Sequence, residues 1–219
     1  IILKHFSDDK DAIKTDYLLS QVKKNNELSV LCLNLLFKRE NKDAHLINQN
    51  LLHSNSLDLK YAAMNNYLKY DNDNKHEIID EITSNLDQNL NCQYIIKYIH
   101  PDYLKLSTNQ FISTAQSLDY ELVINSLDFI EDLNNIKIWD CVLDSCHKQS
   151  FIDSKLINFF HKTNQEDIFN YFESQLLNPA SSIDKKIFIN ELILDLDSKK
   201  AINIYQSFFT QPYKDDYTF

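Results

Sequence analysis

Residues 57–68 read Leu-Asp-Leu-Lys-Tyr-Ala-Ala-Met-Asn-Asn-Tyr-Leu, and this stretch decides the fold class. It lies in a run of helix-forming residues over 57–70. Polar junctions enclose that run, at residues 54–56 (Ser-Asn-Ser) and 71–74 (Asp-Asn-Asp-Asn). Asn and Asp form Asx turns and tolerate left-handed backbone, so they can end a helix without glycine. The stretch therefore predicts a helix between two short turns.

The same alternation of short helices and polar turns extends along the chain. Apolar residues recur at helical spacing on both sides of residues 57–70, whereas the period-2 alternation of strands is scarce. We predict an all-α fold of about 12 helices. Four of the predicted ranges matter below, namely 89–99, 120–133, 136–148 and 183–195.

The 219-residue chain contains no glycine. Phosphate-binding loops, the dinucleotide fingerprint and the nucleophile elbow of α/β-hydrolases use glycine for positive φ and for close backbone approach. Their usual forms are therefore excluded. Abundant Asn, Ile and Lys also indicate an AT-rich genome, which accounts for part of the depletion.

A weak internal repeat favours a particular all-α architecture. Ser56-Leu57-Asp58 recurs as Ser117-Leu118-Asp119, and Asn85-Leu86-Asp87 lies midway between them. A unit of about 30 residues is typical of helical hairpins that stack on one another. We therefore predict an α-solenoid of stacked helical hairpins in one domain over residues 1–212, followed by a short tail at 213–219. A helix bundle with chance recurrence of these triplets is the alternative.

The opening stretch resembles the second helix of a HEAT repeat. That helix has an acidic residue, an aliphatic–basic pair, small residues and a large apolar residue at its end. The matching positions here are Asp58, Leu59, Lys60, Ala62, Ala63 and Tyr67. Residues 119–130 keep only the apolar rhythm, and residues 200–205 resemble a TPR helix instead. Both resemblances imply stacked helical hairpins that bind other proteins.

The net charge of −10 bears on the partner. An acidic chain is repelled by nucleic acids and by anionic membrane surfaces, so neither is expected as a partner. We expect a binding module rather than an enzyme, which uses a concave solenoid face to hold another protein, possibly a basic one. The expected contacts, if exposed on inner helices, are Lys60, Tyr61, Asn65, Glu121 and Asn125.

No cofactor or metal is expected. Asp71 and Asp73 begin like a calcium loop, but His76 stands where that loop needs glycine and Ile82 where it needs glutamate. Cys141, Cys146 and His147 lie close in sequence, yet no second pair of zinc ligands is evident. We expect a buried cysteine here, with the carboxylates of Asp140 and Asp144 on one exposed helix face.

Two alternative functions stay open. An acidic inhibitor or immunity protein could neutralise a basic toxin with the same fold. Residues 139–144, with Trp139, Asp140 and Asp144, faintly resemble a helix of the HEAT-like DNA glycosylases, in which tryptophans and a carboxylate contact an alkylated base. That resemblance implies an enzyme, whereas a Trp139 that anchors the core implies none.

Hydropathy and cysteine usage say little about compartment. No run of 18 apolar residues is present, so no membrane span is expected, and a soluble, cytoplasmic protein is favoured. Cys32, Cys92, Cys141 and Cys146 are spaced too irregularly for a disulfide framework and are expected as free thiols.

Overall fold

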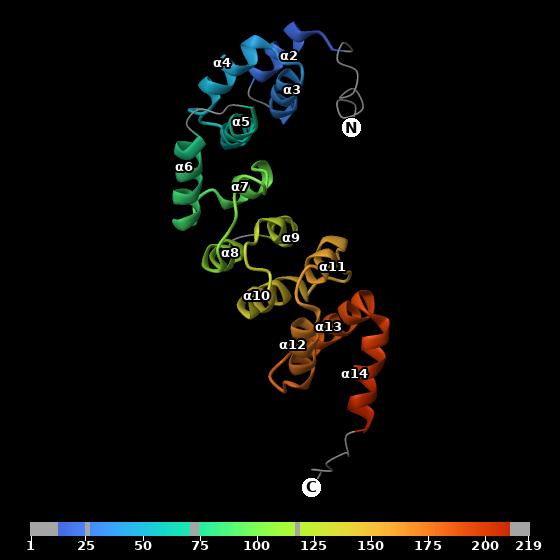
Figure 1. The fold of residues 1–219 in the computed structure, drawn as a ribbon. Coiled ribbons are helices and arrows are strands. Elements are labelled where there is room, and N and C mark those ends of the chain that lie inside the picture. The colour runs from blue at the N-terminus through green and yellow to red at the C-terminus, as the bar shows by residue number, and fades with distance from the viewer. Residues whose placement is uncertain (1–12, 25–26, 71–74, 117–118, 211–219) are drawn as a thin grey trace. The chain divides into compact units, whose positions relative to one another are not determined.

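The protein is all-α. The computed structural model describes residues 13–24, 27–70, 75–116 and 119–210 (Figure 1). These residues form 13 α-helices and one short 3-10 helix, and no strand occurs among them. The predicted tail at 213–219 and the junction at 71–74 lie outside the described residues.

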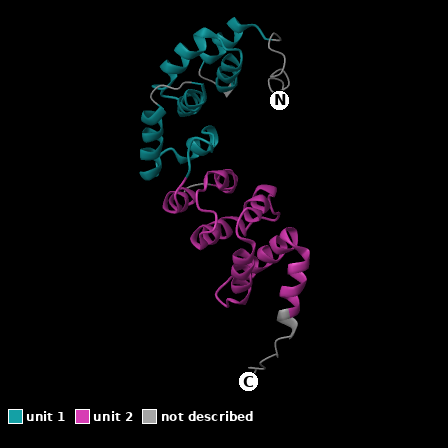
Figure 2. Cartoon of the chain, viewed as in Figure 1, with its two compact units in different colours: residues 1–105 teal, residues 106–219 magenta. Residues whose placement is uncertain are grey.

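The chain divides into two compact units, residues 1–105 and residues 106–219 (Figure 2). They are called unit 1 and unit 2 below, and each is described by itself. The expectation of one repeat domain over residues 1–212 stays a prediction.

Unit 1 contains the first six described helices, which keep the labels of Figure 1. They are α2 (Thr15–Val22), α3 (Glu27–Lys38), α4 (Lys42–Leu51), α5 (Leu57–Tyr70), α6 (Lys75–Asp87) and α7 (Cys92–Tyr98). The core at its N-terminal end joins α2, α3, α4 and α5 through Leu18, Leu33, Leu36, Ala44 and Ala63. The opening stretch of the sequence is α5, and its small alanines at 62 and 63 are fully enclosed.

Unit 2 contains the remaining helices. They are α8 (Thr108–Ala115), α9 (Tyr120–Ser126), η1 (Leu127–Phe129), α10 (Ile136–Cys146), α11 (Ser154–His161), α12 (Gln165–Leu177), α13 (Ile183–Leu196) and α14 (Ser198–Thr210). Its core is aromatic. The Phe160 and Phe172 rings meet edge to face at 5.3 Å, and the Trp139 and Tyr171 rings lie 5.4 Å apart. Pairs of this geometry stabilise a core beyond the apolar area that they bury.

Asparagine takes the place of glycine at one helix junction, as the sequence predicts. Asn89 and Asn91 both have positive φ, at 55° and 56°, in the connection between α6 and α7. This left-handed connection delays the start of α7 to Cys92, so the predicted helix over 89–99 is too long. Glu40 also has positive φ, at 53°, a position that the sequence does not single out.

One further prediction about helices is wrong. The range 120–133 is α-helical to Ser126 and 3-10 helical to Phe129, after which the chain pairs with Leu106. Leu106 donates its N–H to the Phe129 carbonyl at 2.7 Å and accepts one from Glu131 at 3.1 Å, which fixes an isolated β-bridge between Leu106 and Ile130. Residues 85–87 form the end of α6, and the 30-residue repeat stays a prediction.

Candidate functional site

The residues predicted as partner contacts on α5 are occupied by contacts within unit 1. Lys60 forms an ion pair with Glu81 of α6, with 2.7 Å between Nζ and Oε1. The Asn65 side chain accepts the backbone N–H of His100 at 2.9 Å. Both side chains hold α5 against its neighbours.

Tyr61 does not meet the condition set for a contact residue. Its side chain is fully buried, with 0% exposed, whereas the prediction required an exposed face. Its ring stacks on Tyr94 at 6.3 Å, and its hydroxyl accepts a hydrogen bond from Asn85 at 3.2 Å. The tyrosine is a core residue because α6 and α7 both cover this side of α5.

The two predicted contacts in unit 2 lie one turn apart on α9. Glu121 is exposed. Asn125 is half-buried, and its side-chain oxygen accepts a hydrogen bond from Lys155 of α11 at 2.8 Å. Only Glu121 of the five predicted residues is fully exposed.

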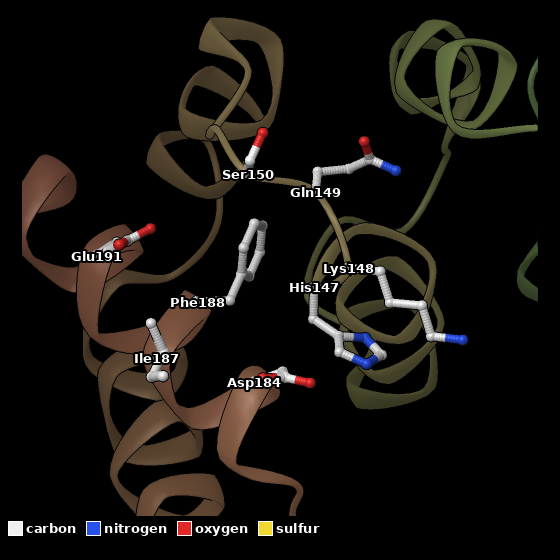
Figure 3. A pocket seen from close by; sticks show the side chains of 8 residues that line it. All are labelled: His147, Lys148, Gln149, Ser150, Asp184, Ile187, Phe188 and Glu191. Carbon is white, nitrogen blue, oxygen red and sulfur yellow. The ribbon is translucent and has the colours of Figure 1, made fainter.

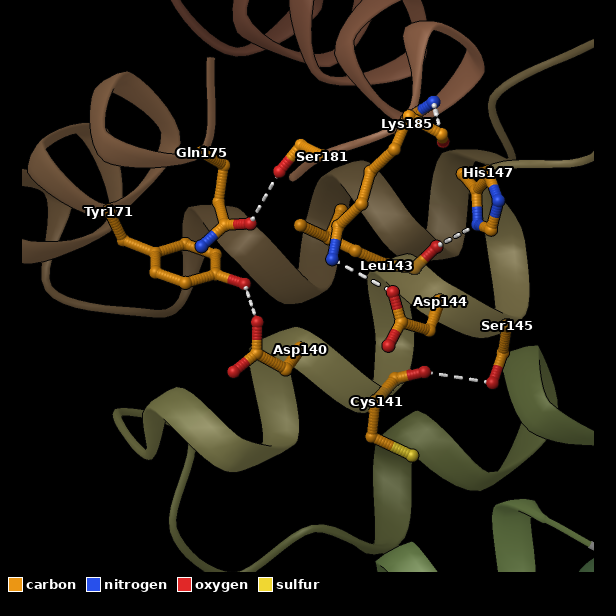
Figure 4. A network of polar contacts seen from close by, with 11 residues as sticks. Asp140, Cys141, Leu143, Asp144, Ser145, His147, Tyr171, Gln175, Ser181 and Lys185 are labelled. Carbon is orange, nitrogen blue, oxygen red and sulfur yellow. Dashed lines mark hydrogen bonds and ion pairs between the residues drawn. The ribbon is translucent and has the colours of Figure 1, made fainter. Parts of the chain in front are cut away.

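Trp139 is a core residue. It is buried, and its indole N–H donates to the Leu133 carbonyl at 2.7 Å. Asp140 and Asp144 share a face, as predicted; Asp144 is exposed, whereas Asp140 is half-buried. Tyr171 donates its hydroxyl to Asp140, and Lys185 forms an ion pair with Asp144 (Figure 4). A tryptophan so enclosed is not available to stack on a flipped base.

A pocket of about 420 Å³ in unit 2 is the candidate site that the structure adds (Figure 3). One wall is the connection that follows α10, and the other is the first half of α13. The lining residues are His147, Lys148, Gln149, Ser150, Asp184, Ile187, Phe188 and Glu191.

The first wall forms where α10 ends without a glycine. The N–H of His147 donates to the Leu143 carbonyl at 2.9 Å, and the N–H of Gln149 donates to the Cys146 carbonyl at 3.0 Å. The His147 ring is fixed too, since its Nδ1 lies 3.0 Å from the Leu143 carbonyl. A carbonyl only accepts, so Nδ1 carries the proton, and Nε2 of the neutral ring is an acceptor.

The second wall is built by the start of α13. Ser182 caps the helix by accepting the N–H of Lys185 at 3.2 Å, which satisfies one of the free donors of the first turn. Asp184, Ile187 and Glu191 are exposed on this wall, while Phe188 is buried and points into the space between the walls (Figure 3). The pocket therefore has an apolar floor and a polar rim, whose two carboxylates both lie on the α13 wall.

Lys185 joins the two walls. Its side chain is only 11% exposed and reaches from α13 to Asp144 of α10, with 2.8 Å between Nζ and Oδ1 (Figure 4). Nearby, burial and the hydrogen bond to Asp140 raise the pKa of Tyr171, so this phenol stays protonated. These two contacts tie α10 to α12 and to α13.

The lining residues combine a hydroxyl, an imidazole, an ammonium, an amide and two carboxylates with two apolar side chains. Among the described residues no hydrogen bond joins the Ser150 hydroxyl to the His147 ring, the pairing by which a base activates a nucleophile. The same residues contain no group of three or more His, Cys, Asp or Glu side chains placed to hold a metal ion. Apolar surface with a few polar groups around it is the usual make-up of a recognition site.

The sequence did not single out this pocket. Its lining residues are of ordinary types and come from two segments about 35 residues apart, so no motif joins them. The sequence of α13 contains one signal. Ile183, Ile187 and Leu194 are apolar but lie outside the buried face of this helix, so α13 has more apolar residues than a single buried face requires.

Comparisons of the chain with protein-family models, with curated proteins and with solved structures found no significant match. Within the described residues, no helix has the length and apolarity that crossing a membrane requires.

Proposed function

We propose that the chain is an α-solenoid of stacked helical hairpins that binds another protein, and that the pocket and the exposed face of α13 hold the partner. The observation that carries the proposal is the pocket itself, where the Phe188 floor and the exposed Ile187 lie inside a polar rim. Interfaces are anchored by apolar side chains of this kind, with polar groups around them.

The packing order of the helices supports the solenoid. Most consecutive helices within a unit pack on one another, and each unit also has contacts between helices two apart, for example α3 with α5, α5 with α7, α8 with α10, and α11 with α13. Two-layer stacks of helical hairpins have this pattern, because each helix contacts its own partner and its equivalent in the next hairpin.

A photoreactive residue tests the binding site. Benzoylphenylalanine replaces Ile187 in cells that make the protein, and a matched variant carries it in place of His76, which is exposed on α6. We expect a polypeptide to cross-link from position 187 and not from position 76. The purified partner should bind the Ile187→Ser variant about tenfold or more weakly than the unmodified chain, since Ile187 is an anchor.

Leu46→Ser is the control, because Leu46 is an exposed apolar residue of a helix in unit 1. Its affinity for the partner should stay unchanged. Equal affinities of Ile187→Ser and the unmodified chain, or cross-linking from position 76 alone, would show that the partner does not use α13.

An acidic inhibitor of a basic protein is the second candidate function. The exposed carboxylates of Asp184 and Glu191 favour it, because they present negative charge at the pocket. The two candidates differ in consequence. An inhibitor abolishes the activity of its bound partner, whereas a scaffold leaves that activity intact.

A further inference from the structure

One side of α13 carries an exposed apolar stripe. Ile183, Ile187 and Leu194 are 76%, 51% and 47% exposed. At 100° per residue they fall at about 0°, 40° and 20° around the helix axis. The three side chains therefore form one line along the helix, over about three turns.

An acidic stripe runs beside it. Glu191, Asp184 and Asp195 fall at about 80°, 100° and 120° on the same scale, and all three are exposed. No ion pair or hydrogen bond in the described part of the chain uses the carboxylates of Asp184 or Glu191. These charges are therefore open to a partner rather than neutralised within the fold.

The two stripes meet at the pocket. Ile187 belongs to the apolar stripe, Asp184 and Glu191 belong to the acidic one, and all three line the pocket (Figure 3). Lys148 on the opposite wall is the one lysine among the lining residues, so the carboxylates outnumber it. A partner that fills the pocket must offer cations next to apolar side chains.

We infer that the partner docks a basic amphipathic helix along α13, with its apolar side on Ile183, Ile187 and Leu194 and its Lys or Arg side chains on the three carboxylates. This inference rests on the proposed protein-binding function and names the chemistry of the partner. The outermost acids, Asp184 and Asp195, lie 11 positions apart, or about 16 Å of helix at 1.5 Å per residue, so a docking helix of about three to four turns matches them.

Charge complementarity selects this occupant over two others. A second copy of the chain would bring its own α13 acids against these, and like charges at an interface are unfavourable. An anionic membrane or a nucleic acid meets the same repulsion, in a chain whose net charge is −10. Opposite charge also speeds the encounter of two proteins, which suits a partner of strongly basic character.

The test uses the full chain and three labelled peptides of about 14 residues. The first is an amphipathic helix of Leu and Lys on opposite sides, the second has Glu in place of Lys, and the third has the Leu and Lys residues in scrambled order. Fluorescence anisotropy gives each affinity. We expect the first to bind about tenfold more tightly than the other two, and its affinity to fall as ionic strength rises.

Charge variants locate the binding. The triple variant D184N/E191Q/D195N should bind the first peptide about tenfold more weakly and lose most of the salt dependence. The matched control D43N/E77Q/D80N removes three exposed acids of unit 1, two of them in the first turn of a helix, as Asp184 is. It should bind like the unmodified chain, although both triple variants have the same net charge.

Each other result has a defined meaning. If both triple variants lose the same affinity for the first peptide, the effect comes from net charge alone and the inference is overturned. A neutral or acidic segment cross-linked from position 187 would overturn it too, while leaving the protein-binding proposal intact. Self-association that Ile187→Ser abolishes, seen by sedimentation, would assign the face to a second copy. If no polypeptide uses α13 at all, both proposals fail.

Discussion

Single polar side chains join one helix to the next in unit 2. The Tyr171 hydroxyl donates to Asp140, and the Lys185 ammonium pairs with Asp144, so two carboxylates one turn apart on α10 hold α12 and α13. Both contacts are partly buried. The Lys185 contact connects the helix that precedes one pocket wall with the helix that forms the other.

Tyr171 should make the stability depend on pH in the alkaline range. Burial raises the pKa of Tyr171 above its ordinary value of 10.0, and the hydrogen bond to Asp140 adds to this rise. The folded state thus holds the proton more tightly than the unfolded state does. Its contribution is complete below about pH 10 and is lost as the pH rises further.

We expect Tyr171→Phe to flatten the fall of unfolding free energy between about pH 9 and pH 11, because the variant has no phenol to ionise at this position. Urea unfolding at several pH values measures the slope. Tyr17→Phe is the control, since Tyr17 is exposed and its removal should leave the slope unchanged. Identical slopes in the two variants would mean that Tyr171 is not held in the protonated form.

The four cysteines should differ in reactivity. Burial raises the pKa of Cys146 to about 12, so almost no thiolate forms near neutral pH. Cys32 and Cys92 are buried as well, whereas Cys141 is partly exposed, although burial raises its pKa too. We expect iodoacetamide to label Cys141 first and the others only on unfolding, as mass spectrometry would record. Labelling of Cys146 as fast as Cys141 would contradict its burial.

For single residues, the sequence predicts which side chains share a helix face better than it predicts which of them are buried. The shared face of Asp140 and Asp144 was predictable from helical spacing, and the free thiols from the irregular spacing of the cysteines. The burial of Tyr61 was not, because it depends on how α6 and α7 pack over α5. Spacing fixes which residues share a face, but only packing fixes what covers that face.

The element that matters most for the proposed function is α13. Ser182 caps its N-terminus, and Phe188, Ile189 and Leu192 lie on its buried side. Its exposed side carries the apolar stripe and the acidic stripe. The first turn lies in the pocket wall, so fraying of this turn would remove the wall.

Ser182→Ala should reduce the unfolding free energy by about 1 kcal/mol, because the mutation removes the cap of α13. Urea unfolding measures the loss. Ser174→Ala is a suitable control, since Ser174 is exposed within α12 and its hydroxyl bonds only to the carbonyl of Tyr171 in its own helix. A helix-interior serine of that kind costs little to replace. A loss no larger at Ser182 than at Ser174 would show that the cap is unimportant.

The bounds of a helix were predictable where capping residues alone determine them and no tertiary contact intervenes. The range 183–195 agrees with α13 to within one residue, since Ser182 is a strong N-cap type. The range 120–133 failed because a tertiary contact, the bridge between Leu106 and Ile130, replaces helical hydrogen bonds there. No local residue pattern reports such a contact.

At the scale of the whole molecule, the proposed solenoid predicts that damage in one place stays local. In a solenoid each hairpin contacts only its neighbours, so the loss of one contact does not spread. A bundle with a single shared core would instead lose stability throughout. The all-α class was predictable from the helical period and the polar junctions, whereas the open face of α13 was not, because exposure depends on every neighbour of the helix.

Leu33→Ala tests this locality. Leu33 is fully buried in the core of unit 1, and its truncation should cost about 2 to 5 kcal/mol there. We expect amide hydrogen exchange to accelerate in α3 and α5 and to stay unchanged in α10 and α13. Equal acceleration in both units would indicate one cooperative core and would contradict the stacked-hairpin arrangement.

The most direct test of the account is a methyl NMR titration of the full chain, labelled at isoleucine, with the protein captured from position 187. The account predicts shifts of the Ile183 and Ile187 methyl resonances, with little change at Ile78 and Ile95 in the core of unit 1. Shifts confined to unit 1, with Ile183 and Ile187 unchanged at saturation, would contradict it.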